Sequence, residues 1–272
     1  MMTDRAAERT IVLTGATSGI GLAAAQQLAR DESTHLILHG PETESAVQPL
    51  LSRLGGKARI DYLQADFDNL DEVVTLAGRV RDLTGQVDVL VNNAGRPGPG
   101  ERKLSANGYE TTLQVNYLAA VLLTEHLMPL LLERPGGRVV HVSSATHLSA
   151  DLELDDLQLE RHPYSPTIAY ARSKLVMIMH ALWLARQQAA PTIVSISPGV
   201  ISTGLLHAMY GVGGAPTEHG ARNVVEAATA SGVTSGAYLD DGSPAQPSRS
   251  ARDHAAQDEL HQLTTELLKP WQ

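Results

Sequence analysis

The segment Tyr170-Ala-Arg-Ser-Lys174 places a phenol and an amine one helical turn apart. Side chains at positions i and i+4 lie on the same face of a helix, so the ammonium could stabilise the phenolate and lower the pKa of the tyrosine from about 10. A tyrosine tuned in this way can exchange a proton with a carbonyl oxygen near neutral pH. Only four of the 21 basic residues are lysines, which makes the spacing informative. An exposed Tyr/Lys pair on a helix would nevertheless give the same pattern.

A glycine-rich turn joins the first predicted strand, residues 10–14, to a helical stretch at 22–30. Its glycines permit a tight turn, the approach of the backbone to a pyrophosphate, and close packing of the helix against the strand. A phosphate would then meet the N-terminus of the helix. The predicted loop residues are Gly15, Thr17, Ser18, Gly19, Ile20 and Gly21. A glycine turn of purely structural use is the alternative.

Further motifs follow in a fixed order along the chain. They are Asp66 after the third strand, Asn92-Asn-Ala-Gly95 after the fourth, Asn116 in a helix, Ser143-Ser144 after the fifth, the Tyr170/Lys174 pair, and Pro198-Gly199 after the sixth. In this set the sequence resembles the short-chain dehydrogenase/reductase family over nearly its whole length. The C-terminal run, residues 217–268, is most similar to the retinol dehydrogenase-like branch.

The resemblance implies a catalytic tetrad of Asn116, Ser144, Tyr170 and Lys174. Tyr170 would act as general acid and base, while Lys174 would also bond the nicotinamide ribose. Ser144 would hold the substrate oxygen at near-attack distance, and Asn116 would support a water relay to the lysine. Ser144 is preferred to Ser143 because it aligns with the family's serine, although both could serve as ordinary turn residues.

The resemblance also implies a dinucleotide cofactor. Asp66 would accept a hydrogen bond from the adenine amino group, the Phe67 backbone would meet the adenine ring, and Thr203 would bond the nicotinamide carboxamide. The other predicted cofactor contacts are His39, Asn92, Ala94, Gly95, Pro198, Gly199 and Val200, with Tyr170 and Lys174. The segment Asn92 to Gly95 could equally serve to stabilise the central sheet.

The residues after the second strand leave the choice of cofactor open. An NAD enzyme should place a carboxylate at the end of this strand, but the chain has His39-Gly40-Pro41, and Glu42 comes one position later. Pro41 stands where relatives often carry the arginine that binds a 2′-phosphate. His39 could donate to that phosphate or could simply be a polar strand end. The sequence therefore favours NADP(H) over NAD(H) by a small margin.

Short apolar runs alternate with helical patterns along the chain. Strands are expected at 10–14, 35–38, 58–63, 87–91, 138–142, 192–196 and 237–239, and helices at 23–30, 70–81, 113–132, 168–188 and 218–228. This alternation implies right-handed crossovers between parallel strands. The sequence predicts an α/β fold with one Rossmann-type, doubly wound parallel sheet of about seven strands, helices on both faces, and a single domain over residues 1–272.

Two segments interrupt the alternation and are expected near the substrate site. Residues 146–166 carry several acidic side chains, and 201–216 combine apolar residues with glycines. Ligands bind beyond the carboxyl ends of parallel strands, where both segments start. An apolar cover at 201–216 would favour a medium to large hydrophobic substrate. The acidic segment would disfavour anionic substrates, unless its charges point to solvent.

Composition excludes several other functions. The net charge of −9 with no long basic run argues against nucleic acid. The charged N-terminus lacks an apolar segment, so no membrane anchor is expected, and a cytoplasmic location is predicted. The histidines, among them His141, His147 and His162, show no metal-ligand spacing, so no metal is expected. A homo-oligomer is left open.

These observations predict an NAD(P)-dependent oxidoreductase that interconverts a carbonyl and an alcohol on a hydrophobic small molecule. Two alternatives remain. One is a dinucleotide- or metabolite-binding regulator without turnover, which would usually have lost a tetrad residue. The other is an epimerase or dehydratase that uses the cofactor on the same fold.

Overall fold

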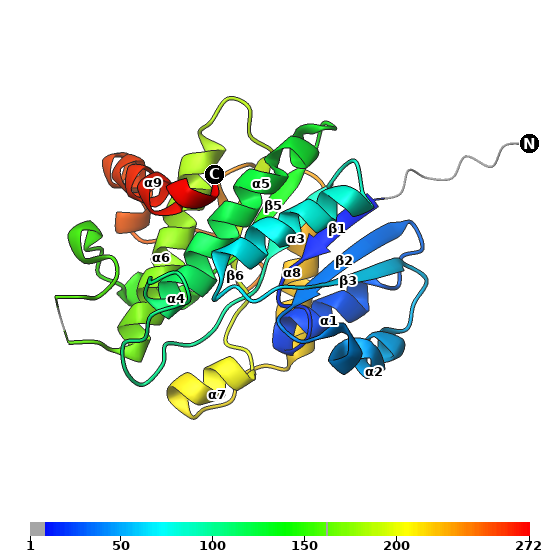
Figure 1. Ribbon diagram of the computed structural model, residues 1–272, viewed down its shortest axis with the longest axis horizontal. Helices are drawn as coiled ribbons and strands as arrows, with labels where there is room; N and C mark the ends of the chain where they lie inside the picture. Colours follow the sequence, from blue (N-terminus) through cyan, green and yellow to red (C-terminus); the bar gives the residue numbers. More distant parts are fainter. Residues whose placement is uncertain (1–8, 162) are drawn as a thin grey trace, which may run out of the picture.

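The computed structural model describes residues 9–161 and 163–272. They form one eight-stranded sheet with the order β3-β2-β1-β4-β5-β6-β7-β8 (Figure 1). Its strands are β1 (Arg9–Leu13), β2 (Thr34–Gly40), β3 (Arg59–Gln64), β4 (Val89–Asn92), β5 (Arg138–Val142), β6 (Thr192–Ser197), β7 (Ala237–Asp240) and β8 (Ser243–Ala245). Strands β1 to β7 are parallel, and β8 pairs antiparallel with β7. The predicted α/β fold is confirmed, with a short edge strand added.

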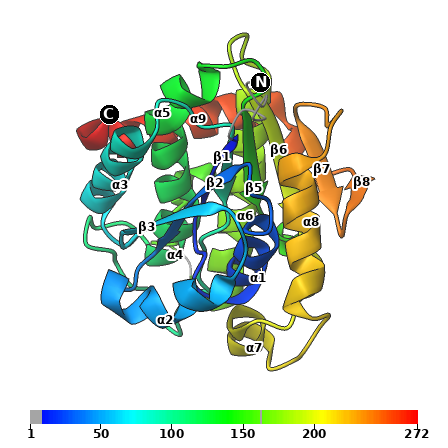
Figure 2. The ribbon, with the colours of Figure 1, turned by 90° about the vertical axis from the view of Figure 1, so that its right-hand side faces the viewer.

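Helices cover both faces of this sheet (Figure 2). One face carries α1 (Gly19–Leu28), α2 (Glu44–Leu54) and α8 (Thr217–Thr229), and the other carries α3 (Leu70–Leu83), α5 (Ala119–Leu132), α6 (Pro166–Ala185) and α9 (His254–Leu268). Successive side chains of a strand point to opposite faces, so Val139 of β5 joins one hydrophobic core and Val140 joins the other. The strand order reverses between β1 and β4, which is where such sheets bind dinucleotides.

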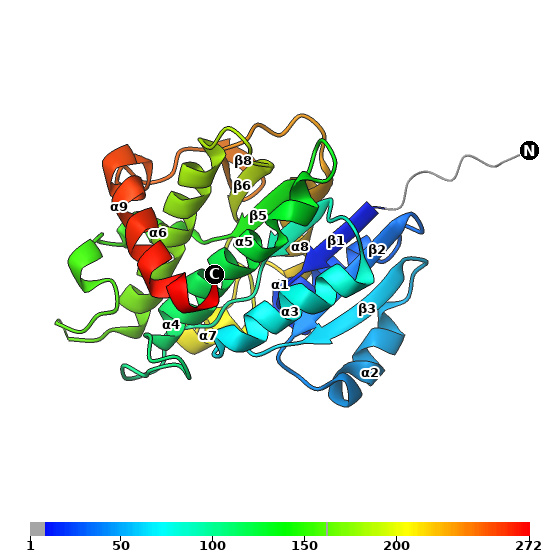
Figure 3. The ribbon, with the colours of Figure 1, turned by 45° about the horizontal axis from the view of Figure 1, so that its top comes forward.

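Helix α6 lies between the sheet and α9 (Figure 3). Because it is enclosed on both sides, most of its residues are buried, among them polar residues that an exposed helix would direct to solvent. Among the described helices, one continuous run, Thr111–Leu132, is long and apolar enough to cross a bilayer, and 61% of its most apolar window is buried inside the fold. Burial in the core accounts for that composition.

Several short elements complete the chain. They are α4 (Thr111–Leu113), the π-helical turn η1 (Gln114–Leu118), α7 (Gly204–Tyr210) and the 3₁₀ turns η2 (Ala145–Ser149), η3 (Leu154–Asp156), η4 (Ser250–Arg252) and η5 (Lys269–Trp271). Residues 1–8 and His162 lie outside the described residues, as do the expectations about the N-terminus and about that histidine.

Candidate active site

The tyrosine and lysine of the predicted pair lie on α6, where Ile168 N donates to the capping Ser165 side chain at 3.5 Å. Both side chains are buried, with 7% of Tyr170 and 3% of Lys174 exposed. Lys174 Nζ lies 5.6 Å from the centre of the Tyr170 ring. It donates a hydrogen bond to the carbonyl oxygen of Val142 at 2.9 Å. The pair is therefore held between α6 and the carboxyl end of β5.

Burial dominates the ionisation of both groups. It raises the pKa of Tyr170 well above its usual range, and a hydrogen bond with the Ser144 side chain opposes that rise. Burial also lowers the pKa of Lys174 to about 8. The sequence predicts a lowered tyrosine pKa, but removal of the phenol from water outweighs the nearby ammonium here. Tyr170 thus holds its proton firmly, while Lys174 remains mostly charged at neutral pH.

The two serines after β5 have different surroundings. Ser143 is buried and its hydroxyl donates to the main-chain carbonyl of Lys174 at 2.9 Å. Ser144 caps η2 by accepting a hydrogen bond from Thr146 N at 3.3 Å, and its side chain reaches the Tyr170 phenol. Ser144 is therefore the serine beside the reactive hydroxyl, while Ser143 holds α6 against the strand.

Asn116 lies in the π-helical turn η1, a local widening that is frequent at functional sites. Its side chain accepts from Arg96 N at 2.8 Å and donates to Arg96 O at 3.1 Å and to the Ser173 hydroxyl at 3.0 Å. A Cβ on Gly95 would lie 3.3 Å from both Asn116 Oδ1 and Lys174 Nζ. The absent side chain at Gly95 thus leaves room beside both groups.

The glycine loop has the tight geometry that its sequence predicts. Gly15 and Gly19 have φ angles of +64° and +52°, which favour glycine. A Cβ on Gly21 would collide with the carbonyl oxygen of Gly15. Asn93 Nδ2 braces the turn by donating to the Gly15 carbonyl at 3.1 Å. A Cβ on Gly19 would lie 3.4 Å from Thr203 Cγ2, so the predicted carboxamide ligand is adjacent to the loop.

This loop fits a pyrophosphate. Ser18 precedes α1, and within the described residues its side chain caps no backbone N–H of that helix. The first-turn N–H groups are therefore left for an anion, as in other dinucleotide sites. Thr17 reaches the end of β2, because a Cβ on Gly40 would lie 2.5 Å from the methyl group of Thr17. Ile20 packs near Gly220 on α8. These residues would hold the phosphates of a dinucleotide bound at this loop.

The predicted phosphate contact of His39 is not supported by its surroundings. The ring is 2% exposed and stacks on Phe67, with ring centres 4.3 Å apart. Its Nε2 bonds the Ala65 carbonyl at 2.9 Å and its Nδ1 accepts from Gly15 N at 3.4 Å. Burial lowers the pKa of His39 to about 4. His39 is therefore a neutral wall residue without a free N–H for a phosphate.

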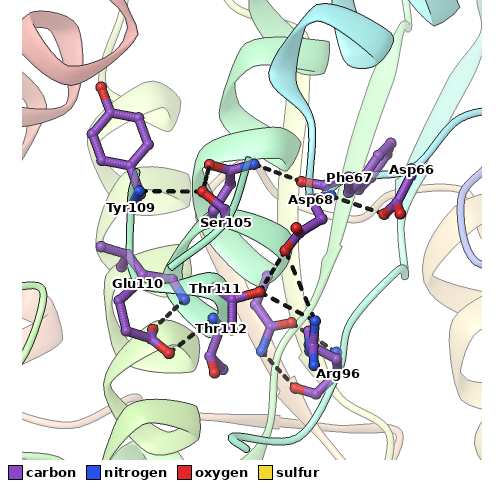
Figure 4. A network of polar contacts seen from close by, with 12 residues as sticks. Asp66, Phe67, Asp68, Arg96, Ser105, Tyr109, Glu110, Thr111 and Thr112 are labelled. Atoms are coloured by element: carbon purple, nitrogen blue, oxygen red, sulfur yellow. Dashed lines mark hydrogen bonds and ion pairs between the residues drawn. The ribbon is translucent and has the colours of Figure 1, made fainter. Parts of the chain in front are cut away.

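Asp66 and Phe67 follow β3 and belong to the polar network of Figure 4. Asp66 accepts from Asp68 N at 2.9 Å and remains exposed, while Phe67 is buried and its carbonyl accepts from Gln114 Nε2 at 3.1 Å. Asp68 accepts from the Thr111 hydroxyl at 2.6 Å. The network fixes the turn on which the predicted adenine ligands lie.

Neighbouring residues of the Asn92-Asn-Ala-Gly95 segment point in different directions. Asn92 is buried, with Nδ2 donating to Thr124 Oγ1 at 3.0 Å, so its side chain stabilises the sheet. Asn93 and Ala94 instead donate from their main-chain N–H groups to Thr14 Oγ1, each at 3.0 Å. The role of Asn93 at the loop was missed by the sequence analysis, because two adjacent asparagines do not reveal which one faces the glycines.

The segment after β6 begins with Pro198, whose carbonyl accepts from Asn223 Nδ2 at 3.1 Å. Gly199 has a φ of +94°, and Val200 is 63% exposed. Thr203 caps α7 by accepting from Leu206 N at 3.1 Å. The ends of this segment are joined where Ile201 pairs with Ala215. Within the described structure α7 buries none of its residues, and this helix projects from the body of the fold (Figure 1).

No group of three or more His, Cys, Asp or Glu side chains within residues 9–161 and 163–272 is arranged to hold a metal ion. Together, the glycine loop, the strand reversal and the buried tyrosine and lysine define a dinucleotide-binding α/β protein with an acid–base site.

Comparisons with known proteins agree with this class. The family model for short chain dehydrogenase matches residues 9–210. The chain therefore belongs to the short-chain dehydrogenase/reductase family, a family of NAD(P)-dependent oxidoreductases acting on alcohol and carbonyl groups. This membership confirms the prediction made from the motifs.

Named relatives are 29% to 40% identical to the chain over the matched residues. A candidate daunorubicin C-13 ketoreductase (DnrU) of Streptomyces sp. (strain C5) is 40% identical over 72% of this chain and 67% of its own length. Polyprenol dehydrogenase of Homo sapiens is 35% identical over 72% of this chain and 62% of its own. Retinol dehydrogenase 13 of Homo sapiens is 29% identical over 72% and 60%. The matched part thus spans about two thirds of these relatives.

A solved structure of an uncharacterised protein from Mycobacterium paratuberculosis is similar over most of the chain. It has a TM-score of 0.81 and 29% sequence identity, and the match covers 97% of this chain and 94% of that one. The similarity therefore extends beyond residue 210, into the C-terminal helices.

Proposed function

We propose that this chain interconverts a carbonyl and an alcohol on a medium to large hydrophobic molecule, using NAD(H) or NADP(H). The observation that supports this most is that one short segment, residues 93–95, contacts both the acid–base residues and the glycine loop. Gly95 packs beside Lys174 and Asn116, while Asn93, two residues earlier, holds the Gly15 turn. Hydride chemistry and proton transfer need this proximity, because both reach the same carbonyl group.

Each residue then has a distinct task. When bound, the nicotinamide supplies the hydride for carbonyl reduction. Tyr170 gives its proton to the carbonyl oxygen, and its raised pKa keeps that proton in place until negative charge develops. Ser144 donates to the same oxygen and fixes its position. Lys174, mostly charged at neutral pH, stabilises the resulting phenolate.

The structure alters the argument about the cofactor. The small preference for NADP(H) rested partly on His39, which has no free donor. A Cβ on Gly40, at the end of β2, would lie 2.8 Å from Glu42 Oε2, so a carboxylate does reach this strand end. A carboxylate there bonds the ribose 2′-hydroxyl and repels a 2′-phosphate. We propose that NAD(H) is accepted at least as well as NADP(H), with Glu42 as the discriminating residue.

The proposed hydrophobic substrate is supported by the residues that flank the site. Exposed apolar side chains occur in η2, in the first turn of α6 and in the segment after β6, namely Leu148, Ile168, Val200, Tyr210 and Val212. Apolar side chains beside a site favour apolar ligands. The relatives named for daunorubicin and polyprenol point to bulky lipophilic molecules as well.

The acidic segment is less negative than its composition suggests. Its carboxylates pair with arginines in three places: Glu160 with Arg102 at 3.1 Å, Asp155 with Arg161 at 2.7 Å, and Glu153 with Arg172 at 3.0 Å. The pairs with Arg172 and Arg102 hold the segment to α6 and to the 96–104 region, while the pair with Arg161 lies within the segment. Repulsion of anionic substrates by this segment is therefore not part of the proposal.

The test is a screen of carbonyl and alcohol compounds with NADH and NADPH, followed at the nicotinamide absorbance band. A series of hydrophobic ketones should have higher specificity constants than short polar or anionic ones, and preference for small anionic carbonyls would overturn the substrate proposal. Tight cofactor binding without turnover of any compound would instead favour the regulator. Conversion without net change in nicotinamide absorbance would favour an epimerase or dehydratase.

A further inference from the structure

His147 is a buried side chain, 0% exposed, that lies in η2 three residues after Ser144. Its main-chain N donates to the Ser144 carbonyl at 3.2 Å, and its ring Nδ1 lies 2.8 Å from the same oxygen. The other ring nitrogen, Nε2, accepts from Ser248 N at 3.2 Å. Ser248 belongs to the segment between β8 and η4, 101 residues further along the chain. The imidazole therefore joins the peptide of the candidate catalytic serine to the C-terminal part of the fold.

The two ring contacts assign one protonation state to His147. A carbonyl oxygen only accepts hydrogen bonds, so Nδ1 carries the proton that is shared with Ser144 O. A main-chain N–H only donates, so Nε2 presents its lone pair to Ser248. Burial also lowers the pKa of His147, although the bond to Ser144 and the charge of Asp240 oppose this shift. The ring is therefore neutral at pH 7, with its proton on Nδ1.

These contacts fix the peptide group that follows Ser144. Its oxygen is held by the two N–H groups of His147, and its nitrogen, Ala145 N, donates to Ser197 Oγ at 3.1 Å. On the other side of the serine, Ser143 N donates to a carbonyl of β6 at 2.7 Å. The backbone is thus bound to neighbouring elements before and after Ser144, and this sets the direction in which the Ser144 hydroxyl points.

The outer side of the imidazole is also held. The Ser248 hydroxyl accepts from Ala251 N at 3.2 Å, and the Ala251 carbonyl accepts from Gln257 Nε2 of α9 at 2.7 Å. The His147 ring packs edge-on against Tyr238 of β7, with ring centres 5.2 Å apart. The C-terminal segment therefore determines where the imidazole lies, and the imidazole in turn determines where the serine carbonyl lies.

We propose that His147 is a positioning residue for the reaction: its Nδ1–H holds the Ser144 carbonyl so that the Ser144 hydroxyl faces the Tyr170 phenol and the substrate oxygen. The inference rests on the proposed function. His147 acts through Ser144, because the ring is buried and both of its nitrogens are occupied. Ser248 acts one step further out, by keeping the imidazole in the tautomer that has a donor for Ser144.

A small displacement of Ser144 should have a measurable effect on turnover. Removing a hydrogen-bond donor from a reacting oxygen lowers kcat by about 10² to 10³, and misplacing a group by about 1 Å can cost about 10². Loss of the Nδ1 bond leaves the main-chain bond of His147 and the Ala145 contact in place. We therefore expect a partial displacement of Ser144 and a loss in kcat of about ten-fold, below both of these values.

The test uses two substitutions that each keep one of the two ring bonds. In His147→Asn the side-chain amide can take the place of Nδ1 and donate to Ser144 O, whereas in His147→Gln it can take the place of Nε2 and accept from Ser248 N. We expect kcat to fall about ten-fold in His147→Gln and only about two-fold in His147→Asn, with cofactor dissociation constants unchanged in both. The matched controls are His35→Gln and His35→Asn, because His35 is 1% exposed and bonds Asp61 at 2.7 Å near the amino end of β2. Neither control should lower kcat.

A double-mutant cycle separates positioning from a general loss of structure. In a Ser144→Ala background, His147→Gln should have no further effect on kcat, because the hydroxyl that His147 positions is absent. A merely structural role would lower kcat by the same factor with and without the hydroxyl, and that result would overturn the proposal. Equal losses of kcat in His147→Gln and His147→Asn would contradict it as well.

Two further readouts need no turnover. A crystal structure of His147→Gln should show Ser144 Oγ displaced from Tyr170 relative to wild type, and an unchanged distance between the two residues would refute the positioning role. Nitrogen NMR of the wild-type imidazole needs no variant and should show a neutral ring protonated at Nδ1 at pH 7, whereas a ring protonated at Nε2 would exclude the bond to Ser144. A wild type without turnover would refute the proposed function, while these two measurements would still decide the role of His147.

Discussion

Replacing Lys174 by methionine should change how stability depends on pH, in a direction fixed by burial. The pKa of Lys174 is about 8 in the folded protein, against an ordinary value of 10.5. Below pH 8 the group is charged in both states, and the folded protein bears the full cost of burying the charge. Between pH 8 and 10.5 the folded protein loses the proton while the unfolded chain keeps it. The unfolded state then binds more protons, so stability rises with pH.

The expected size follows from the difference of 2.5 between these two pKa values. At about 1.4 kcal/mol for each pKa unit, the full cost is about 3.5 kcal/mol, of which about 3 kcal/mol is recovered by pH 10.5, where half of the unfolded chains still carry the proton. The free energy of unfolding of wild type, minus that of Lys174→Met, should therefore increase by about 3 kcal/mol between pH 7 and about pH 10.5. The lost hydrogen bond to Val142 cancels to a first approximation in this comparison, because the ammonium and the neutral amine can both donate it.

The assay is urea unfolding of the two proteins, without cofactor, across this pH range. Lys269→Met is a matched control, because the Lys269 side chain is 73% exposed and its replacement should give curves parallel to wild type. Parallel curves for Lys174→Met, or a fall of the difference with rising pH, would refute the claim that burial dominates at Lys174. The same ionisation should lower the rate of carbonyl reduction above about pH 8, as the ammonium that stabilises the phenolate is lost.

Three further substitutions test the site. Tyr170→Phe keeps the ring but removes the transferable proton, so the rate should fall on the order of 10² to 10⁴ while cofactor dissociation constants stay close to wild type; near-normal turnover would remove Tyr170 from the mechanism. Ser144→Ala should lower kcat more than Ser143→Ala, which should mainly lower thermal stability, because only Ser144 reaches the phenol. Glu42→Gln and Pro41→Arg should each lower the NADPH dissociation constant relative to the NADH dissociation constant. An unchanged ratio of the two constants in both variants would show that this strand end does not face the ribose.

The features predicted well from sequence are local ones. The phosphate loop follows from glycines within seven residues of a strand end, and the Tyr170/Lys174 relation follows from one helical turn. Helix α2 was not predicted, because it contains Pro49 and buries only Val47 and Leu54. The strand β8 has three residues and an internal proline, so its sequence lacks the alternation that identifies a strand.

The features predicted poorly depend on contacts between distant segments. Nothing local to His39 shows that Ala65 and Gly15 occupy both ring nitrogens. Likewise, the contact between the Asn92 and His141 side chains was not visible, because these residues become neighbours only through the register of β4 and β5. Each of these residues looked like an isolated polar strand position. Strand order and register, which set such contacts, are properties of the whole sheet.

Burial links the reactivity of Lys174 to the rest of the site. An ammonium has three N–H donors, and within the described part of the chain Lys174 has one acceptor, the carbonyl of Val142. Gly95 keeps the neighbouring space free of a side chain, so ribose hydroxyls or water can meet the remaining donors. Because a buried charge is tolerated only when its donors are satisfied, the lysine is best stabilised when the site is filled. The same burial that lowers the pKa of Lys174 therefore also favours cofactor binding. The space that Gly95 leaves beside the ammonium is what would allow the ribose hydroxyls to reach it.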